Sequence, residues 1–254
     1  MPTQSKIVAV TSLAREAMIA RGNGVSVVCS QSSQLHAALG AAIDPGVSGI
    51  ISFGISGGLN PKLVAGDWVV ATAVRYRGRA IATESGWTQE LFRRLPGAVL
   101  AEIVGSDTLV PDPSEKSYLY KSTGAAAVDM ESHIAAEIAA ERKIPFAACR
   151  VIIDSAERTL PPVTALALDA SGTVNLLAVM RSILRSPGQL PALLRTAADA
   201  CIAERALRKG RKWLGEGLGS PAMLGRADSI GRSEGRAEES DELLRSSPPV
   251  FGRT

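Results

Sequence analysis

The stretch VSGIISFGISGGL, residues 47–59, decides the fold of this chain. Its first nine residues are mostly apolar and rich in β-branched side chains, which is typical of a strand buried in a sheet. The strand runs straight into the glycine-rich segment GISGGL, where the backbone can approach a ligand or a helix closely. That segment has neither the spacing of the dinucleotide fingerprint nor the Lys and Ser/Thr of a nucleotide-binding phosphate loop. By itself it predicts a tight turn after a core strand.

Short apolar strands alternate with alanine-rich helical segments on both sides of this stretch. Further strands are predicted at residues 6–10, 24–30, 66–78, 101–107 and 145–156, and helices at 32–43 and 129–144. Alternation of this kind is the pattern of a mostly parallel sheet with helices on both faces.

Composition narrows the class of protein. Of the 254 residues, 46% are hydrophobic, which excludes disorder of the whole chain and fits one α/β domain with a large core. A net charge of +3 and 4% aromatic residues give little support to nucleic-acid binding, which uses basic patches and stacking platforms. No stretch approaches the ~20 apolar residues that span a bilayer. The composition therefore predicts a soluble protein with no nucleic-acid partner.

Cysteine usage points to a reducing compartment. Cys29, Cys149 and Cys201 are odd in number, far apart and without CxxC or Cys/His spacing. Neither a disulfide framework nor a zinc site is indicated. We expect a cytoplasmic protein without a metal.

The C-terminal part of the chain changes in character. Residues 189–214 have apolar side chains at three-four spacing, which predicts an amphipathic helix packed on the sheet. Its basic end could instead contact an anionic membrane surface at the inner face of the membrane. The residues of that end are Arg208, Lys209, Arg211, Lys212, Trp213 and Leu214. Gly, Ser, Arg, Glu and Pro dominate afterwards, so we expect one catalytic domain over residues 1–214 and a disordered tail over 215–254.

Polar residues follow several of the predicted strands. They lie at 12–16, at 56–58, at Ser106 and Asp107, and at Asp154. Because parallel α/β sheets bind ligands at the carboxyl ends of their strands, we expect these residues to meet at one edge.

A second unusual stretch is AVDMESHI, residues 126–133, which places Asp129 and Glu131 on either side of Met130 in an otherwise apolar segment. The two acids belong either to a helix start, where the dipole favours them, or to a ligand site.

Taken together, the segments GISGGL, GDWVVATAVRY, GSD, VDMES and RVIIDSA occur in an order that resembles the nucleoside phosphorylase and nucleosidase superfamily. The resemblance covers roughly residues 6–160 and is strongest to the branch of the 5'-methylthioadenosine/S-adenosylhomocysteine nucleosidases. Residues 185–195, RSPGQLPALLR, are similar to a stretch of the hopanoid-associated phosphorylases, which are associated with removing adenine from adenosylhopane, a lipid nucleoside. The resemblance implies a three-layer α/β fold with a mixed central sheet and helices on both faces.

The resemblance also implies roles for individual residues in cleaving the N-glycosidic bond of an adenine nucleoside. Asp154 faces N7 of the purine and supplies a proton to the leaving base. Glu131 receives the ribose hydroxyls, since a carboxylate can accept two hydrogen bonds at once. Met130 lies under the sugar. The remaining contacts with the nucleoside are assigned to Leu13, Ser56, Gly57, Leu109 and Val110.

Simpler interpretations stand beside these roles. Met130 could fill a gap in the core, and Asp154 could cap a turn after its strand. Asp129 is expected to be a structural partner, and His133 a hydrogen-bonded packing residue.

The nucleophile that attacks the sugar is either water or phosphate, and the segment TSLAREA offers one candidate partner for each. Glu16 matches the base that activates water in the hydrolytic relatives, whereas Arg15, with Ser12, matches a phosphate site of the phosphorolytic ones. Their side chains point about 100° apart if a helix starts here, so both are not expected to face one atom. The family name favours phosphate as co-substrate. A third interpretation is an ordinary charged first turn of a helix. No metal or organic cofactor is expected.

Two positions depart from the pattern of the relatives. Ile153 stands where the nucleosidases often carry Ser before the aspartate, and Leu109 stands where relatives often have an aromatic residue over the base. Both changes make the expected pocket more aliphatic.

The group attached to the 5' carbon of the nucleoside is not fixed by any motif. A soluble methylthioadenosine/S-adenosylhomocysteine nucleosidase is therefore the alternative enzyme, and a non-catalytic nucleoside-binding protein the alternative of another class. Relatives assemble as dimers or larger oligomers, and a homo-oligomer is expected here.

Overall fold

The computed structural model describes residues 6–160 and 190–223. Its strands are β1 Lys6–Thr11, β2 Val25–Cys29, β3 Val47–Gly58, β4 Trp68–Tyr76, β5 Arg79–Ala82, β6 Val99–Gly105, β7 Ala127–Asp129 and β8 Phe146–Asp154. Its helices are α1 Ala14–Ala20, α2 Ser32–Ala42, α3 Ser85–Arg94, α4 Pro113–Thr123, α5 Ser132–Arg142 and α8 Leu190–Leu214, with a 3-10 helix, η2, at Glu216–Gly219. The helix predicted from residue 129 begins at Ser132, because Asp129 ends β7.

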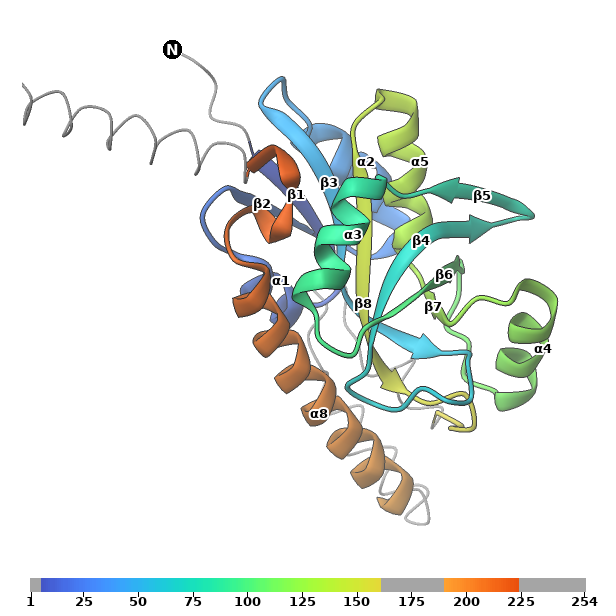
Figure 1. The fold of residues 1–254 in the computed structure, drawn as a ribbon. Coiled ribbons are helices and arrows are strands. Elements are labelled where there is room, and N and C mark those ends of the chain that lie inside the picture. The colour runs from blue at the N-terminus through green and yellow to red at the C-terminus, as the bar shows by residue number, and fades with distance from the viewer. Residues whose placement is uncertain (1–5, 161–189, 224–254) are drawn as a thin grey trace, which may run out of the picture.

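The strands form one mixed sheet (Figure 1). β1, β2, β3 and β8 run parallel to one another, whereas β7 is antiparallel to β3 and β4 is antiparallel to β8. β6 pairs in parallel with both β4 and β7, so the pairings close a circuit through β3, β8, β4, β6 and β7. The mixed sheet implied by the resemblance is confirmed. Parallel pairings outnumber antiparallel ones, as the strand–helix alternation suggested.

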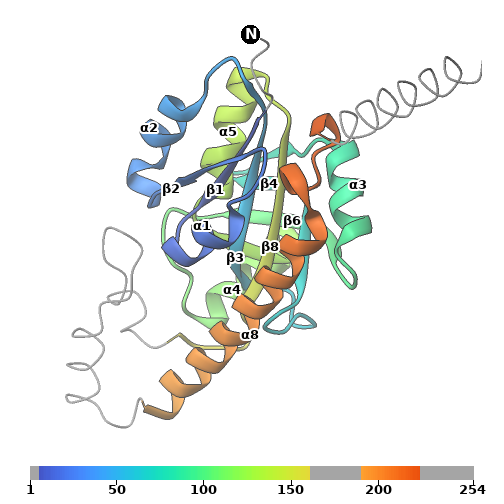
Figure 2. The same cartoon turned by 90° about the vertical axis from the view of Figure 1, so that its left-hand side faces the viewer.

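Helices cover both faces of the sheet (Figure 2). Leu35 and Leu39 of α2 join Ile138 of α5 in the apolar cluster on one face. Ile19 of α1, Leu91 of α3 and Leu207 of α8 belong to the cluster on the other face, with Phe53 of β3. Each fully buried Leu contributes roughly 1.5–3 kcal/mol relative to exposure. The predicted three-layer architecture is confirmed.

The glycine-rich segment after the core strand is not a turn. β3 continues through Gly58, pairing in parallel with β8 up to Gly57 and antiparallel with β7 at Gly57 and Gly58. The register against β8 shifts between Ser56 and Gly57, where Ile153 of β8 has no partner. A methyl group at Gly57 would lie 3.3 Å from Val128 Cγ1, closer than most such contacts. The glycines allow one strand to change partners here.

The folded unit extends beyond the boundary predicted at residue 215. Leu214 and Leu218 are fully buried, and the Trp87 indole N–H donates to the Leu218 carbonyl at 3.0 Å. Arg94 Nη1 donates to the Leu214 carbonyl at 2.9 Å. Residues 215–223 therefore belong with the fold, and the predicted boundary is too early. The remainder of the predicted tail, residues 224–254, lies outside the described residues, as do residues 185–189 of the hopanoid-like stretch.

The basic end of α8 faces the domain in part. Arg211 donates to the backbone carbonyls of Ala20, Arg21 and Gly215, and Leu214 is buried. Lys209 lies 4.8 Å from the centre of the Trp213 ring. Arg211 and Leu214 are thus not available to a membrane surface, and that part of the alternative interpretation is wrong.

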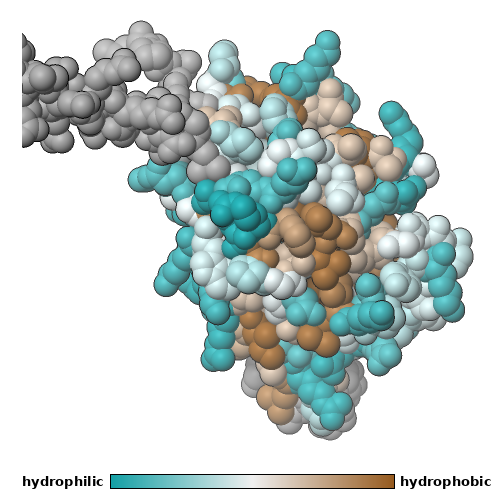
Figure 3. All heavy atoms as spheres, viewed as in Figure 1, coloured by the Kyte–Doolittle hydropathy of each residue, from teal (hydrophilic) through white to brown (hydrophobic). Residues whose placement is uncertain are grey.

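Apolar residues also occur on the surface. On the face seen in Figure 1, they lie near the centre and are bordered by hydrophilic side chains (Figure 3). No helix within residues 6–160 and 190–223 is long and apolar enough to cross a membrane.

Candidate active site

Asp154 ends β8 opposite Gly57 of β3. Its side chain is buried, and a methyl group at Gly57 would lie 3.6 Å from Asp154 Oδ1. The other carboxylate oxygen accepts a hydrogen bond from the ammonium of Lys116 in α4. Burial raises the pKa of Asp154, and the contact with Lys116 opposes that rise. Asp154 and Gly57 are therefore brought together as the resemblance implied.

A second charged cluster is centred on Arg150, four residues earlier in β8. Its guanidinium is fully buried and lies 2.7 Å from Asp129 Oδ2 and 3.6 Å from Glu131 Oε2. It also donates to the hydroxyls of Ser52 and Ser132. A strand between two helical layers is the least favourable place for a charge, and the carboxylates compensate for the burial of this one.

The two acids of the AVDMESHI segment differ in role: Asp129 belongs to the start of a helix, whereas Glu131 faces the candidate site. Asp129 Oδ1 accepts from the backbone N–H groups of Glu131 and Ser132 at the start of α5, at 3.3 and 2.9 Å. Asp129 is thus a structural partner that caps the helix and holds Arg150. Glu131 occupies the N-cap position, but its side chain makes no capping hydrogen bond. Its carboxyl group remains directed at Arg150.

Glu16 joins the same cluster from α1. It is 2% exposed, and its Oε2 accepts from Ser12 N, Ser12 Oγ and Leu13 N, while Oε1 accepts from Ile55 N at 2.7 Å. A methyl group at Gly54 would collide with Glu16 Oε1 and lie 2.7 Å from Arg150 Nη1. The glycine therefore leaves room for the carboxylate beside the guanidinium.

Arg15 points away from this cluster. Its side chain is 72% exposed and pairs with Glu204 of α8 at 2.8 Å. The predicted separation of Arg15 and Glu16 around the helix is observed. Ser12 lies beside Glu16 rather than beside Arg15, so the structure does not assemble the phosphate site expected from these two residues.

Three carboxylates around one guanidinium leave an excess of negative charge. Burial raises the pKa of Glu131 to about 8, Arg150 opposes this, and the nearby Asp129 and Glu16 add to it. Glu131 therefore keeps its proton to a higher pH than an ordinary carboxyl group does, and in its protonated form it can both donate to and accept from a sugar hydroxyl.

The other expected nucleoside contacts lie around these groups. Val110 is buried against Leu59 and Val128, next to Gly57 in the β7–β3 pairing. Ser56 Oγ is buried without a hydrogen-bond partner among the described residues. Met130 is half-buried, as is Leu13, whereas Leu109 is 38% exposed.

Ser106 and Asp107 do not join Asp154 at the expected edge. Asp107 accepts from the Tyr76 hydroxyl at 2.9 Å and pairs with Arg77 at 3.2 Å. It also lies 3.5 Å from His133 Nε2, and the His133 ring stacks on Tyr76 at 4.2 Å. His133 is a packing residue, as predicted. β6 and β3 pair with opposite sides of β7, Val104 and Gly57 both with Val128, so β7 lies between Ser106 and Gly57. The Ser106 N–H donates to the Asp129 carbonyl at 2.8 Å.

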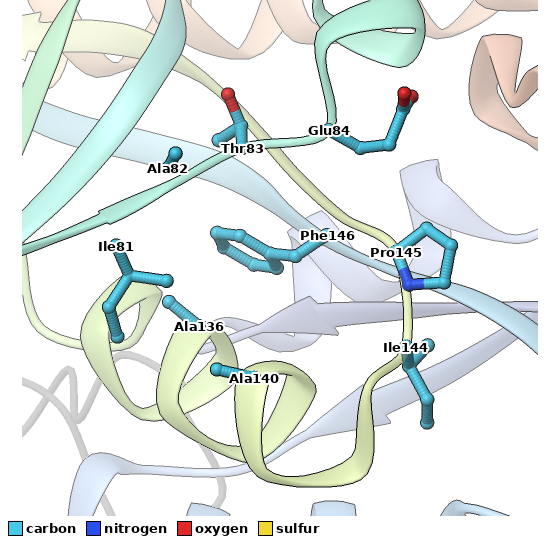
Figure 4. A pocket seen from close by; sticks show the side chains of 9 residues that line it. All are labelled: Ile81, Ala82, Thr83, Glu84, Ala136, Ala140, Ile144, Pro145 and Phe146. Carbon is cyan, nitrogen blue, oxygen red and sulfur yellow. The ribbon is translucent and has the colours of Figure 1, made fainter.

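Two cavities lie among the described residues, and the first adjoins the pairing of Gly105 with Asp129. One, of about 410 Å³, is lined by residues that include Tyr76, Ser106, Asp107 and Leu119. The other, of about 210 Å³, lies around Phe146 at the start of β8, with Ile81, Ala136 and Ala140 (Figure 4). Phe146 and Asp154 are at opposite ends of β8, so this second cavity is remote from the candidate site.

Two functional candidates escaped the sequence analysis. Arg150 had a signal, since it is the one charged residue inside the otherwise apolar run AACRVII. Lys116 had none, because it occurs in the polar helix PSEKSYLYKST, where a lysine is ordinary. No cluster of three or more His, Cys, Asp or Glu side chains suited to a metal occurs in the part of the chain that the structure describes.

Comparison with solved structures gives the same fold. A methylthioadenosine/S-adenosylhomocysteine nucleosidase from Helicobacter pylori is 15% identical, with a TM-score of 0.60, over 83% of this chain and 96% of that one. One from Colwellia psychrerythraea, in complex with adenine, is 20% identical, with a TM-score of 0.55, over 61% and 84%. The futalosine hydrolase of Helicobacter pylori is 15% identical, with a TM-score of 0.56, over 83% and 95%. At these identities the likeness concerns the fold alone.

No protein with a curated description matches the sequence. A family model described as the phosphorylase superfamily matches residues 11–184, which is more than half of the chain. The predicted enzyme class, a nucleoside phosphorylase or nucleosidase that cleaves an N-glycosidic bond, is confirmed at the level of this family. The chain belongs to the phosphorylase superfamily.

Proposed function

We propose that the protein releases adenine from an adenine nucleoside, with adenosylhopane as the substrate and water as the nucleophile. The observation that carries the proposal is the pair of acidic groups along β3, with Asp154 at Gly57 and the Glu16–Glu131–Arg150 cluster at Gly54. Three residues of a strand span about 10 Å. That spacing is on the scale of a nucleoside, with the purine at one end and the ribose hydroxyls at the other.

Each end of this arrangement matches one need of the reaction. Cleavage of the glycosidic bond moves electrons into the purine and leaves positive charge on the sugar. A proton given by Asp154 to N7 makes the leaving purine neutral, which is general acid catalysis. Glu131 holds the ribose hydroxyls, so that the nucleophile meets C1' in line, and such positioning contributes several kcal/mol.

The charges around C1' favour water over phosphate. Glu16 is inside the cluster and Arg15 is outside it, bound to Glu204. Arg150, the one arginine that is buried among the described residues, is already surrounded by Asp129, Glu131 and Glu16. A phosphate dianion would add negative charge where carboxylates already exceed cations. Glu16 Oε1 accepts one backbone hydrogen bond and keeps a lone pair for a water proton.

The lipid substrate is supported by the position of α8. Arg158, in the loop after Asp154, pairs with Asp199 of α8 at 2.6 Å, so the helix passes beside that loop. Leu194 and Ile202 of the same helix are 62% and 46% exposed. An apolar 5' chain leaving the pocket along α8 would cover these side chains, which a methylthio group is too short to do.

The second candidate substrate is methylthioadenosine or S-adenosylhomocysteine. Its support is that two of the structures compared above are nucleosidases named for those substrates. Adenine release from adenosylhopane, dispersed in detergent, and from methylthioadenosine distinguishes the two by chromatography. A higher kcat/KM for methylthioadenosine would reject the lipid nucleoside.

The nucleophile is tested by repeating the assay in phosphate-free buffer and with added phosphate, with mass analysis of the sugar. We expect release without phosphate and a free sugar as product. Strict dependence on phosphate with a 1-phosphorylated sugar would make the protein a phosphorylase. Tight nucleoside binding without release at any enzyme concentration would instead favour the non-catalytic binder.

The assembly and location of the protein remain part of the proposal. We propose a cytoplasmic homo-oligomer in which a neighbouring subunit closes the 5' end of the pocket. Peripheral contact with the membrane would use the exposed side chains Arg208, Lys209, Lys212 and Trp213. Light scattering gives the oligomeric state, and cosedimentation with anionic vesicles tests the membrane contact.

A further inference from the structure

Lys116 is the one buried residue of α4. Its side chain is fully inaccessible, whereas Tyr118, two positions later, is 70% exposed. A surface helix normally buries apolar residues, and lysine is almost never fully buried without a partner. The partner that accounts for the burial of Lys116 is Asp154 of the candidate active site.

The ammonium of Lys116 uses all of its donors. It donates to the Asp154 carboxylate, to the Ser155 carbonyl at 3.1 Å and to the Arg158 carbonyl at 3.1 Å. An ammonium has three N–H groups, so none is left unpaired. The two carbonyl contacts fix the ammonium, and the fixed ammonium holds Asp154 Oδ2. Both oxygens of Asp154 lie near Gly57, 3.6 and 3.8 Å from the position of a methyl group there.

The other charges near Asp154 nearly cancel. Arg158 follows in the loop after β8, and Asp199 faces it from α8 in an ion pair at 2.6 Å. Both act on Asp154 in opposite directions and more weakly than Lys116 does. The protonation state of Asp154 is thus decided mainly by its own burial, which favours the neutral acid, and by Lys116, which favours the carboxylate.

We propose that Lys116 is a positioning residue for glycosidic bond cleavage, which keeps Asp154 ionised in the empty site and stabilises the carboxylate that forms when Asp154 gives its proton to the base. The proposal rests on the proposed function of Asp154. It adds one step to the reaction. Because Asp154 is ionised in the empty site, it must take up a proton when a nucleoside binds through N7.

Protons and electrons balance in the proposed reaction. Asp154 takes one proton from solvent as the nucleoside binds. The C1'–N9 bond breaks, its electron pair passes into the purine, and the Asp154 proton moves to N7. The water oxygen bonds to C1', and the proton that this water loses leaves through Glu16. Asp154 is again a carboxylate beside Lys116, which lowers the energy of the transition state in which that charge develops.

Two adenosine analogues that resist hydrolysis report the state of Asp154. Formycin A carries N–H at the position of N7, which suits an ionised Asp154, and tubercidin carries C–H there. A charge-assisted hydrogen bond is worth about 1.5–3 kcal/mol, so the wild type should bind formycin A about 10-fold or more tightly than tubercidin. The ratio of the two dissociation constants, measured by calorimetry, is the readout.

Lys116→Met keeps the length of the side chain and removes the charge. Asp154 is then expected to be a neutral acid at neutral pH. It can still accept the formycin A N–H through its carbonyl oxygen, but the hydrogen bond is no longer charge-assisted, so the ratio should fall towards 1. On an adenine nucleoside the variant should lower kcat more than it raises KM. Lys121→Met, on the exposed side of the same helix, is the control and should leave the ratio and kcat unchanged.

A ratio in Lys116→Met equal to that of the wild type would make Lys116 a clamp for the loop and overturn the proposal. If that variant does not fold, the wild type decides alone. The preference for formycin A should persist from mildly alkaline to mildly acidic pH, and a preference that appears only above neutral pH would overturn the proposal. A normal preference without any adenine release would reject the proposed function but keep this role for Lys116. Failure to bind either analogue would reject both.

Discussion

At the end of β8, one carboxylate has one buried cation to itself, whereas beside Gly54 three carboxylates share a single guanidinium. Asp154 pairs with Lys116, and the ammonium has no unused donor. Glu16, Asp129 and Glu131 surround Arg150. Both clusters are buried, so burial does not explain the difference between them.

The difference lies in where a proton is needed. In the proposed reaction, the balanced pair returns to the same charge after each turnover, because the proton that Asp154 takes up is given to the base. The unbalanced cluster retains a proton on Glu131, whose pKa rises to about 8, and this proton can be shared with a sugar hydroxyl. Under the proposed function, one cluster transfers a proton and the other holds the ribose and activates water.

The largest effect is expected at the balanced pair. Asp154→Asn keeps the shape of the side chain but cannot give a proton to N7, so adenine release should fall about 100-fold or more while nucleoside binding largely survives. Single-turnover release of adenine measures this. Asp107→Asn is the matched control, an exposed strand-end aspartate held by Tyr76 and Arg77. Near-normal turnover in Asp154→Asn would remove the functional contrast between the clusters.

The sequence analysis identified the acids of both clusters but missed their buried cations. Asp154, Glu131 and Glu16 stand in motifs, so their place near the glycine-rich strand could be predicted. Arg150 could have been found as the one charge within an apolar run. Lys116 could not, because its burial depends on how α4 packs on the loop after β8, and no local pattern encodes that packing.

The fold shows the same limit at a larger scale. Periodicity predicted the main strands and helices, but not the direction of β4, β6 and β7, which depends on long-range pairing. Ser106 and Asp107 are separated from Asp154 because β7 lies between β6 and β3. Likewise, GISGGL looked like a turn because its glycines remove side chains, whereas the structure uses them to let β3 change partners.

The unbalanced cluster is tested first at Glu16. Glu16→Gln removes the base that activates water and puts an amide N–H₂ among donors, so phosphate-independent adenine release should fall about 100-fold. The free sugar is measured by mass analysis. Glu84→Gln is the control, since Glu84 likewise accepts backbone N–H groups, those of Gly86 and Trp87, at the start of a helix. Release at the wild-type rate in Glu16→Gln would show that the cluster binds sugar without activating water.

The proton on Glu131 should also appear in stability. Its pKa of about 8 in the folded protein lies above the ordinary value of 4.5, so the folded state holds the proton more tightly than the unfolded chain does. The resulting stabilisation is complete below the ordinary value and is lost as pH rises through about 8. One pKa unit is worth about 1.4 kcal/mol. Because Asp129 and Glu16 titrate together with Glu131, we expect only part of the full shift to appear, a decrease of about 2 kcal/mol in the free energy of unfolding over this window.

Glu131→Gln should flatten this dependence, and urea denaturation at several pH values measures it. Glu141→Gln, at an exposed position of α5, should keep the wild-type slope. The same Glu131 variant should bind ribonucleosides more weakly and lose the preference over 2'-deoxyribonucleosides. An unchanged slope together with an unchanged preference would mean that the cluster is charge-balanced by other groups and that the contrast with Asp154 does not hold.

The smallest effect is expected just outside the unbalanced cluster. Arg15 neighbours Glu16 in sequence, but it is 72% exposed and pairs only with Glu204 on the surface of α8. A surface ion pair contributes about 0–1 kcal/mol, so Arg15→Ala should shift the midpoint of thermal unfolding only slightly. Because the guanidinium is absent from the site, adenine release should change by less than about 2-fold, with or without phosphate. A phosphate-dependent rate that collapses in Arg15→Ala, and not in Glu16→Gln, would mean that α1 rearranges to bring Arg15 to C1'. Arg15 and Arg150 would then bind phosphate together. Hydrolysis would have to be abandoned in favour of phosphorolysis.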